Sequence, residues 1–499
     1  MAESAATSLA YTFAREHGVL VLERGDVATI GVRGTAPPHS LLEARRALGI
    51  PIRVRRLSPT EFERSLAETY AIAGIGAGEV DDDLRQDESL DQVLRGISTS
   101  TDLLEVEDEG PIIRLINGLI AEAVKVRASD IHIEPYETKL SVRLRVDGIL
   151  AEVVKLSQRA APLLVSRIKV MARLDIAEKR LPQDGRISLS IAGAAIDVRV
   201  STLPAQHGER VVLRLLDKRK GQLDLGGLGM SRDVLASFKR ALAEPNGIIL
   251  VTGPTGSGKT TTLYAGLSSL NDKTRNILTV EDPIEYALDG IGQTQVNAKV
   301  GLTFAAGLRA ILRQDPDIVM VGEIRDAETA QIAVQASLTG HLVLSTVHTN
   351  DAVSAITRLR DVGIEPFLLA STVKAILAQR LVRRLCDACK EPHTVAATER
   401  GLLGTVHAKA RTIYRPKGCN ACKGQGYVER IGIYELVTVT EELRRMIHDD
   451  RAEHDLAKAA FRESATLRAS AMDHVAAGLT SLEEALRVSR SEGALDDRV

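Results

Sequence analysis

The chain has 499 residues, of which 44% are hydrophobic and 26% are charged, and this composition excludes a fibrous repeat or a largely disordered chain. Its formal net charge of −2 excludes an overall basic field that would attract nucleic acid or an acidic membrane surface. Because one core does not usually grow to this length, we expect two to four domains.

The N-terminus lacks the basic, apolar and small-residue pattern of a secretory signal, since Met1 is followed by Ala2, Glu3 and Ser4. The longest stretch without charge, Thr329–Asn350, is interrupted by polar residues and glycine, which makes it a poor membrane span. We therefore expect a cytoplasmic protein that reaches a membrane only through partners.

The first elements along the chain predict a small mixed domain. Helix-like apolar runs occur at Leu41–Ala47 and Pro59–Tyr70, and we find no catalytic motif among them. The strongly acidic segment Glu79–Gly110 follows, opposed only by Arg85 and Arg95. It shows little apolar periodicity, which favours a linker.

After this segment the pattern predicts a helix and then strands. Pro111 can occupy a first helical turn, and one apolar face of the following helix consists of Ile112, Ile116, Leu119 and Ala123. Apolar and polar residues then alternate in Ser141–Asp147, and apolar residues recur at every second position from Ile196 to Val200. Both patterns are typical of strands with one buried face.

From Gly247 onward, apolar strands alternate with helical segments, a rhythm typical of a mostly parallel α/β sheet. The predicted strands are Ile248–Val251, Ile277–Val280, Ile318–Val321 and Leu342–Ser345.

A phosphate-binding loop follows the first of these strands. The pattern GxxxxGK[ST] is matched by Gly253, Pro254, Thr255, Gly256, Ser257, Gly258, Lys259 and Thr260. Glycines let backbone N–H groups approach phosphates, Lys259 supplies positive charge, and the hydroxyl of Thr260 can bind magnesium. We predict binding of ATP with Mg²⁺ by these residues and Thr261.

Carboxylates and histidines follow the later strands. Glu323 comes after the third strand and is the first catalytic candidate, although many phosphate-loop enzymes have aspartate there; the alternative is a surface glutamate. A second cluster, Glu281, Asp282 and Glu285, follows the second strand at an edge where α/β proteins collect ligand groups. His341 and His348 bracket the fourth strand, and either could sense a phosphate or be a buried, hydrogen-bonded histidine.

The chain has four cysteines in two CxxC pairs, Cys386 with Cys389 and Cys419 with Cys422. Four thiolates fit a tetrahedral zinc site without an open coordination position, so we expect a role in stability or docking, not in chemistry. The 29 residues between the pairs exceed the usual 15 to 20, which predicts a small subdomain between them. Unmetallated thiols or disulfides are the alternatives.

The run Gln379–Arg384 before these cysteines is locally basic. It can be a solvated helix face, or it can contact an acidic partner or lipid headgroups.

Four segments, in this order, resemble the secretion ATPase superfamily: a phosphate loop, an acidic box, a second acidic motif carrying glutamate, and a histidine box. They are Gly253–Thr260, Thr279–Glu285, Gly322–Asp326 and Thr339–Asp351. The resemblance covers about 111–476 and is strongest to the type II secretion ATPases, the general secretion pathway protein E (GspE/PulE) family. Retraction-type pilus ATPases generally lack the four cysteines, whereas secretion and pilus-assembly ATPases commonly carry them.

The resemblance implies a fold. Ala128–Glu134, Arg180–Arg186 and Gly208–Leu216 resemble the PAS-like second N-terminal domain of that family. The implied class is α/β, with a RecA-like P-loop ATPase core, a PAS-like α/β domain, a small N-terminal domain and a four-cysteine zinc subdomain. The implied boundaries are 1–78 for the partner-docking domain, 79–110 for the acidic linker, 111–220 for the PAS-like domain, 221–499 for the ATPase domain with C-terminal helices, and 384–427 for the zinc subdomain within it.

The resemblance also implies catalytic residues. Lys259, Glu281, Glu323 and His348 are joined by six arginines whose guanidinium groups would stabilise charge in the transition state, with surface salt bridges as the alternative for each. These arginines are Arg199, Arg214, Arg309, Arg313, Arg325 and Arg358. ATP, Mg²⁺ and Zn²⁺ are the implied cofactors, and the implied assembly is a homo-hexamer.

The function implied is MgATP hydrolysis that drives pseudopilus assembly and protein export across the outer membrane. The N-terminal domain would recruit the chain to inner-membrane secretion proteins, at the cytoplasmic face of that membrane. A type IV pilus assembly ATPase and a non-catalytic nucleotide-binding scaffold are alternatives. A nucleic-acid motor is disfavoured, because the chain has no Trp, 6 Phe and 8 Tyr and so offers few surfaces for stacking bases.

Overall fold

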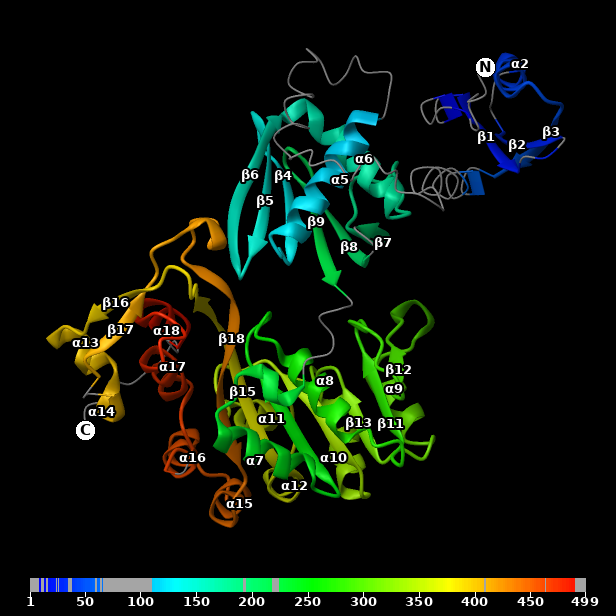
Figure 1. Ribbon diagram of the computed structural model, residues 1–499. Helices are drawn as coiled ribbons and strands as arrows, with labels where there is room; N and C mark the ends of the chain where they lie inside the picture. The colour runs from blue at the N-terminus through cyan, green and yellow to red at the C-terminus, as the bar shows by residue number, and fades with distance from the viewer. Residues whose placement is uncertain are drawn as a thin grey trace. The chain divides into compact units, whose positions relative to one another are not determined.

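The fold is known from a computed structural model of the chain (Figure 1). It describes residues 110–191, 194–217, 224–407, 410–462 and 464–489, and, nearer the N-terminus, residues 9, 13–14, 17–23, 25, 27–34, 38–58, 61–62 and 65. Contacts divide the chain into two compact units, Met1–Lys218 and Arg219–Val499. The predicted linker, apart from Gly110, and most of the predicted run 59–70 lie outside the described residues.

A three-stranded sheet begins the first unit. It consists of β1 (Val19–Glu23), β2 (Ala28–Arg33) and β3 (Ile52–Leu57), with β1 antiparallel and β3 parallel to β2. The parallel pairing needs a crossover, which α2 (Pro38–Leu48) supplies. The helix predicted at 41–47 is therefore confirmed.

The rest of the first unit is a six-stranded antiparallel sheet in the order β6-β5-β4-β9-β8-β7. Its strands are β4 (Asp130–Pro135), β5 (Lys139–Val146), β6 (Ile149–Ser157), β7 (Gln183–Ile191), β8 (Ala194–Ala205) and β9 (Gly208–Asp217). The helices α5 (Gly110–Lys125) and α6 (Ala161–Met171) share one core with it. The alternation seen in the sequence buries Val142 and Leu144 of β5 and Val198 of β8.

A seven-stranded sheet forms the centre of the second unit, in the order β12-β11-β13-β14-β10-β15-β18. All neighbours are parallel except β18, which is antiparallel to β15. The strands are β10 (Gly247–Thr252), β11 (Ile277–Glu281), β12 (Gly292–Gln295), β13 (Ile318–Val321), β14 (Leu342–Val347), β15 (Val373–Leu385) and β18 (Tyr427–Thr438). The four strands predicted from the sequence are confirmed, with a mostly parallel sheet.

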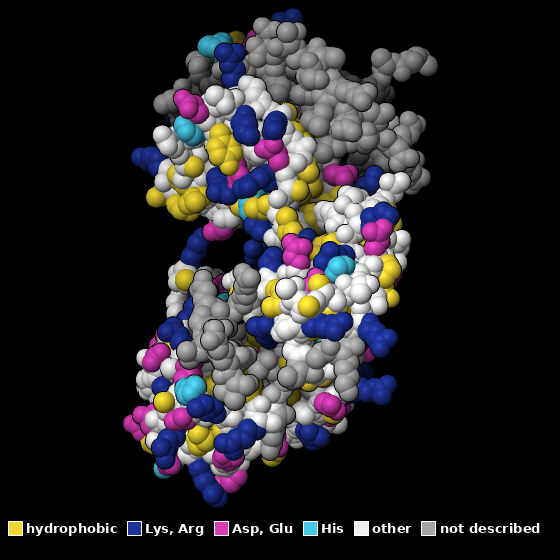
Figure 2. Space-filling view, turned by 90° about the vertical axis from the view of Figure 1, so that its left-hand side faces the viewer, with side chains coloured by type: hydrophobic (Ala, Val, Ile, Leu, Met, Phe, Trp, Pro, Cys, Tyr) yellow, Lys and Arg dark blue, Asp and Glu magenta, His cyan; other side chains and the backbone are white. Residues whose placement is uncertain are grey.

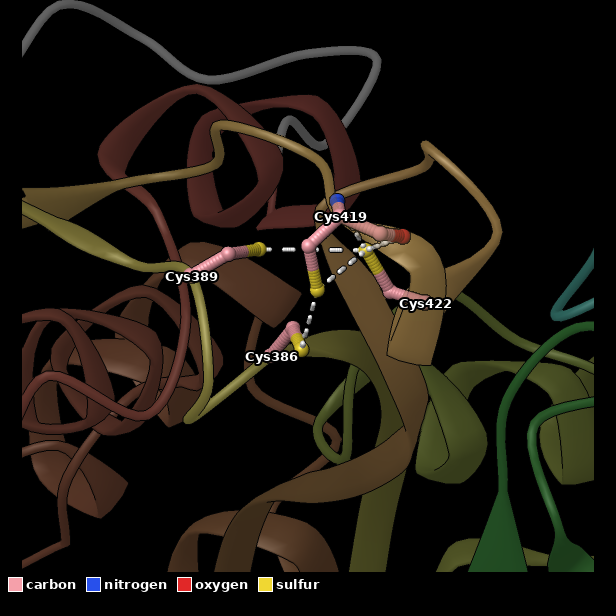
Figure 3. Close-up of side chains that lie close together, drawn as sticks. All are labelled: Cys386, Cys389, Cys419 and Cys422. Atoms are coloured by element: carbon pink, nitrogen blue, oxygen red, sulfur yellow. Dashed lines mark hydrogen bonds between the residues drawn. The ribbon is translucent and has the colours of Figure 1, made fainter.

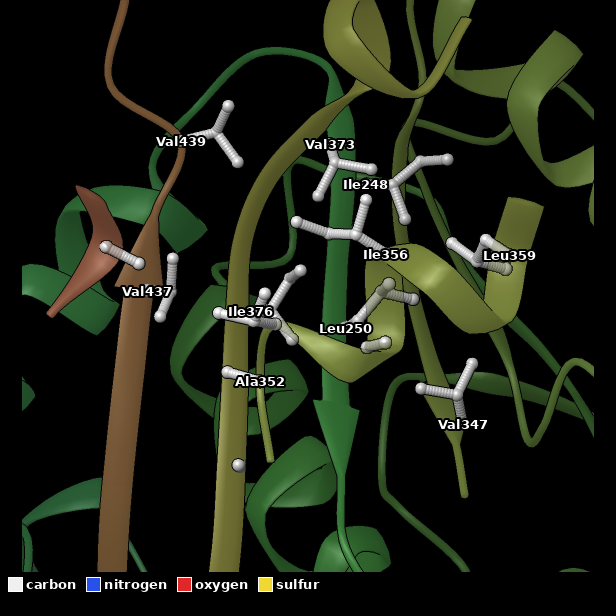
Figure 4. Close-up of a cluster of buried hydrophobic side chains, with 14 of the residues drawn as sticks. Ile248, Leu250, Val347, Ala352, Ile356, Leu359, Val373, Ile376, Val437 and Val439 are labelled. Atoms are coloured by element: carbon white, nitrogen blue, oxygen red, sulfur yellow. The ribbon is translucent and has the colours of Figure 1, made fainter. Parts of the chain in front are cut away.

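Two hydrophobic cores lie against the two faces of this sheet, because alternate residues of each strand point to opposite faces. Ile248 and Leu250 of β10 belong to one core, with residues of α9 (Phe304–Ile311), α10 (Ala327–Leu338), α11 (Ser354–Asp361) and α12 (Pro366–Thr372). Figure 4 shows them close to Ile356 and Ile376. Ile249 and Val251 belong to the other core, with residues of α7 (Arg232–Leu242) and α8 (Lys259–Leu270).

The chain between β15 and β18 forms a small insertion. It contains the antiparallel pair β16 (Glu391–Thr394) and β17 (Thr412–Arg415) and the short helices α13 (Ala397–Leu402) and α14 (Gly404–His407). Four helices follow β18: α15 (Glu441–His448), α16 (Glu453–Ala460), α17 (Leu467–Ala476) and α18 (Leu482–Ser489). No helix in the described part of the chain is long and apolar enough to cross a membrane.

The basic run 379–384 lies in strand β15, so its interpretation as a helix face is wrong. Arg383 donates to the buried carboxylate of Glu484 at 2.8 Å and lies over the ring of Tyr427. Arg384 pairs with Asp387 at 2.8 Å. These partners within the chain account for charges that the sequence alone left open to a partner or a lipid.

Candidate functional site

The predicted phosphate loop connects β10 to the N-terminus of α8, where unpaired backbone N–H groups favour anions. Gly253 has φ +143°, and a Cβ atom there would meet Ser257 Oγ at 2.7 Å. Glycine is therefore required at this position. Gly258, with φ +89°, precedes the first helical residue, Lys259.

The ammonium group of Lys259 is held by its own loop. Nζ donates to the carbonyl oxygens of Gly253 and Pro254 at 2.7 and 3.1 Å. Burial lowers the pKa of Lys259, and the negative charge of Glu323 opposes that shift. The lysine is thus fixed inside the loop and within the field of the candidate catalytic carboxylate.

Gln379 of β15 clamps the phosphate loop from the neighbouring strand. Its side chain is 1% exposed, and Nε2 donates to the carbonyl oxygen of Ser257 at 2.6 Å. Sequence reasoning missed this residue. The available signal was an uncharged polar side chain within a strand of apolar and basic residues.

Glu323 lies just beyond the carboxyl end of β13, with its side chain 12% exposed. One carboxylate oxygen contacts Arg325, and the other lies 3.2 Å from Nε2 of His348, which follows β14. The backbone of this edge is fixed because Thr346 Oγ1 donates to the carbonyl oxygen of Gly322 at 2.7 Å. Parallel neighbouring strands thus bring three predicted site residues together.

The two candidate histidines lie at opposite ends of β14. His341 precedes the strand, and its Nδ1 is 2.9 Å from the carbonyl oxygen of Ala336. His348 follows the strand beside Glu323, with its side chain 49% exposed. The geometry therefore favours His348 as the residue able to contact a ligand.

Glu281 at the end of β11 is buried and surrounded by donors. Its carboxylate accepts hydrogen bonds from Thr279 Oγ1 at 2.6 Å, from Gln293 Nε2 at 3.0 Å, and from the hydroxyl of Tyr264. Burial and this carboxylate both raise the pKa of Tyr264. The network joins the helix of the phosphate loop to the acidic segment, while a catalytic role for Glu281 stays a prediction.

The predicted arginines of the second unit divide in two. Among the described residues, Arg325 is the one of these four that contacts Glu323. Arg309 of α9 pairs with Glu328 at 2.5 Å, and Arg313 donates to the carbonyl oxygen of Arg309 at 2.9 Å. Arg358 is exposed on α11.

Arg199 and Arg214 of the first unit lie opposite each other on β8 and β9. Arg214 Nε donates to Oδ1 of Asp130 at 3.0 Å, and Ser129 Oγ donates to Oδ2 of the same carboxylate at 2.7 Å. Asp130 therefore orients Arg214, a part that sequence reasoning did not give it.

The four cysteines converge where β15 ends and β18 begins (Figure 3). Their sulfur atoms all lie within 4.8 Å of one another. The separations of Cys386–Cys419, Cys389–Cys422 and Cys419–Cys422 are 3.9, 3.8 and 3.8 Å. A tetrahedron with Zn–S bonds of about 2.3 Å has edges of about 3.8 Å, so the four thiols fit a zinc ion.

Backbone groups shape this cluster. The N–H groups of Cys419 and Gly426 each approach Sγ of Cys422 at 3.1 Å. Burial raises the pKa of Cys422, but these donors outweigh it and leave the pKa below its usual range. Gly418 has φ +99°, and its Cβ position would meet the backbone of Gly424, so glycine is required there.

Charges of both signs cover the molecular surface. Figure 2 shows Lys and Arg side chains interspersed with Asp and Glu on the face that it presents. This mixture is in keeping with the formal net charge of −2.

Comparisons with known families match nearly the whole chain. A family model described as "Type II/IV secretion system protein" matches residues 105–487, and a model of the N-terminal domain of "GSPII protein E" matches residues 8–70. The chain is 53% identical to "Type II secretion system protein E" of Aeromonas hydrophila over 98% of each chain. It is 52% identical to "Type II secretion system ATPase E" of Vibrio cholerae over 97% of this chain and 96% of that one.

Two solved structures show a similar fold. The ATPase DotB of Legionella pneumophila matches with a TM-score of 0.55 and 22% identity over 75% of this chain and 94% of its own. The pilus retraction motor PilT with bound ADP matches with a TM-score of 0.52 and 26% identity over 76% and 97%. The predicted α/β fold with an ATPase core is therefore confirmed.

Proposed function

This chain belongs to the type II/IV secretion system protein family, and we propose that it drives pseudopilus assembly and protein export across the outer membrane by hydrolysing MgATP. The type II secretion relatives align over nearly the full length of both chains. This favours secretion over the alternatives of pilus assembly and a nucleic-acid motor.

The observation that carries the proposal is the charged edge of the parallel sheet. Lys259 lies in the field of Glu323, and Glu323 contacts both Arg325 and His348. Lys259 would hold the terminal phosphates, and Glu323 would orient and accept a proton from the attacking water. Arg325 would stabilise negative charge that develops during transfer.

The proposed metal sites have different roles. Mg²⁺, when bound with ATP, neutralises phosphate charge, and Thr260 is placed at the start of α8 to contact it. Zn²⁺ would be held by the four cysteines, whose sulfur separations fit tetrahedral coordination. With all four positions filled by protein, this second site would stabilise the insertion between β15 and β18.

The proposed partners follow from the resemblance and the matched domains. The N-terminal segment, which matches its own family model over residues 8–70, would dock onto inner-membrane secretion proteins and recruit a cytoplasmic chain to that membrane. We propose a homo-hexamer, in which the arginines of one subunit can complete the nucleotide site of another.

ATP turnover by the purified full-length chain tests this function. We expect hydrolysis that requires Mg²⁺, stops with a chelator, and is unchanged by added DNA or RNA. Lys259→Ala should lower kcat/KM by about 10² or more, since it removes the cation that holds phosphate charge. The exposed lysine Lys239 of α7 provides the control variant Lys239→Ala, and strong stimulation by nucleic acid would contradict the proposal.

A further inference from the structure

Glu435 is a buried carboxylate in the apolar part of β18, and its side chain bonds to two distant backbone segments. The residue is 3% exposed. One carboxylate oxygen accepts from the N–H of Ala352 at 2.9 Å, and the other accepts from the N–H of Leu467 at 3.0 Å. Ala352 belongs to the loop after β14, and Leu467 is the first residue of α17.

The loop 348–353 is the segment that carries the candidate histidine. His348 at its start lies 3.2 Å from Glu323. The hydroxyl of Thr349 lies 2.7 Å from that of Thr252, the last residue of β10 before the phosphate loop. Ala352 at the other end is buried against the core drawn in Figure 4. The bond from Glu435 therefore fixes the far end of a loop whose near end contacts both parts of the nucleotide site.

The second bond of Glu435 leads toward the cysteine cluster. Two residues beyond the end of α17, the carbonyl oxygen of Gly478 accepts from Nζ of Lys390 at 3.2 Å. The next carbonyl oxygen, that of Leu479, accepts from the N–H of Leu385 at 2.8 Å. Leu385 directly precedes Cys386. Glu435 thus joins the histidine loop to a helix anchored beside the cysteines.

The charged form of this carboxylate is costly at such a buried position. Burial raises the pKa of Glu435 to about 7, although the N–H groups of Ala352 and Leu467 oppose the shift. The charged side chains that act on it are Asp351, which raises its pKa further, and Arg380, which lowers it. Its two bonds are strong only while the group is ionised, so they are at full strength above neutral pH.

We propose that Glu435 is a positioning residue for ATP hydrolysis, which holds the loop 348–353 to α17 and thereby keeps His348 against Glu323. This inference rests on the proposed function of Glu323 and His348. Because the bonds of Glu435 lead to Ala352 and Leu467, and not to the phosphate loop, it should act on the turnover step and not on nucleotide binding.

Glu435→Gln tests the proposal because the amide keeps the shape of the side chain but places an NH₂ group against a backbone N–H. We expect kcat to fall about tenfold, the value of one lost buried hydrogen bond, with KM for ATP within about twofold of wild type. The matched control is Glu484→Gln, which alters another buried carboxylate that anchors α18 to β15. It should lower the melting temperature and leave kcat within about twofold.

A double-mutant cycle with His348→Ala separates positioning from general destabilisation. If Glu435 acts through His348, the double variant should turn over no more slowly than His348→Ala alone. Independent, multiplying effects, or a Glu435→Gln variant with wild-type kcat beside an impaired His348→Ala, would overturn the inference. Wild-type turnover by His348→Ala would instead overturn the proposed role of His348, and this inference with it.

The pH dependence of the wild-type protein supplies a measurement that needs no variant. Below its raised pKa of about 7, Glu435 gains a proton and one of its two bonds weakens. We therefore expect kcat to fall from about pH 8 to about pH 6 with KM nearly constant, and we expect this limb to be missing in Glu435→Gln. A level wild-type kcat over this range would overturn the inference.

Discussion

Replacing Glu323 by Gln is expected to lower kcat for ATP hydrolysis by about a thousandfold, the contribution typical of a positioned general base. The amide keeps the volume of the side chain but removes the negative charge that pairs with Arg325 and faces His348. Lys259 and the phosphate loop are unchanged by this substitution, so the variant should still bind MgATP. Steady-state turnover and equilibrium binding of a fluorescent ATP analogue measure the two effects separately.

The control for this experiment is Glu441→Gln, which alters an exposed carboxylate at the start of α15. It should turn over at the wild-type rate. If Glu323→Gln also hydrolysed ATP at that rate, another group would have to activate the water. Glu281 would then become the next candidate, despite the three donors that surround it.

Removing the metal ligand Cys386 is expected to have the largest effect on local stability. In Cys386→Ser the thiolate set loses a member, and structural zinc can contribute on the order of 10 kcal/mol to the folding of its site. The purified wild type should contain one zinc per chain, and the variant should contain much less. We expect limited proteolysis to cleave the variant between β15 and β18 under conditions in which the wild type stays intact.

Gln425→Ser is the matched control, since Gln425 is an exposed residue in the same cysteine loop. Its zinc content and its resistance to protease should equal those of the wild type. A Cys386→Ser variant as resistant as the wild type, together with no zinc in either protein, would contradict a structural zinc site. Chelation of the wild-type protein should reproduce the effect of the substitution.

Local patterns predicted the framework of the nucleotide site. The apolar strand before Gly253 and the helix after Lys259 lie where the sequence placed them, because strand periodicity and glycine spacing are local properties. The meeting of Glu323 and His348 could also be expected, since both follow strands of one parallel sheet. The four cysteines were predictable as a cluster from their spacing, and the structure brings their sulfur atoms together.

Contacts between distant segments could not be predicted in this way. Gln379 is separated by 122 residues from the loop residue it contacts, and Glu435 by 83 residues from Ala352. Strand pairing alone decides which partners such side chains meet. The basic run was misinterpreted for the same reason, because Arg383 finds Glu484 only when α18 packs on β15.

The predicted domain boundaries and catalytic roles remain proposals. The contacts separate two units after Lys218, close to the proposed boundary between 220 and 221. Arg199 and Arg214 lie in the first unit, and Arg309, Arg313, Arg325 and Arg358 lie in the second. Substituting each arginine by alanine and measuring turnover would separate those that stabilise charge from those that form salt bridges.

The central claim is that ATP turnover by this chain drives type II secretion. The most direct test is to delete its gene in the host, complement the strain with wild type or Lys259→Ala, and measure secreted hydrolases in the culture supernatant together with surface pili. We predict that deletion stops secretion and leaves pili normal, and that wild type restores secretion while Lys259→Ala does not. Restoration by Lys259→Ala, or a loss of pili with normal secretion, would contradict the claim.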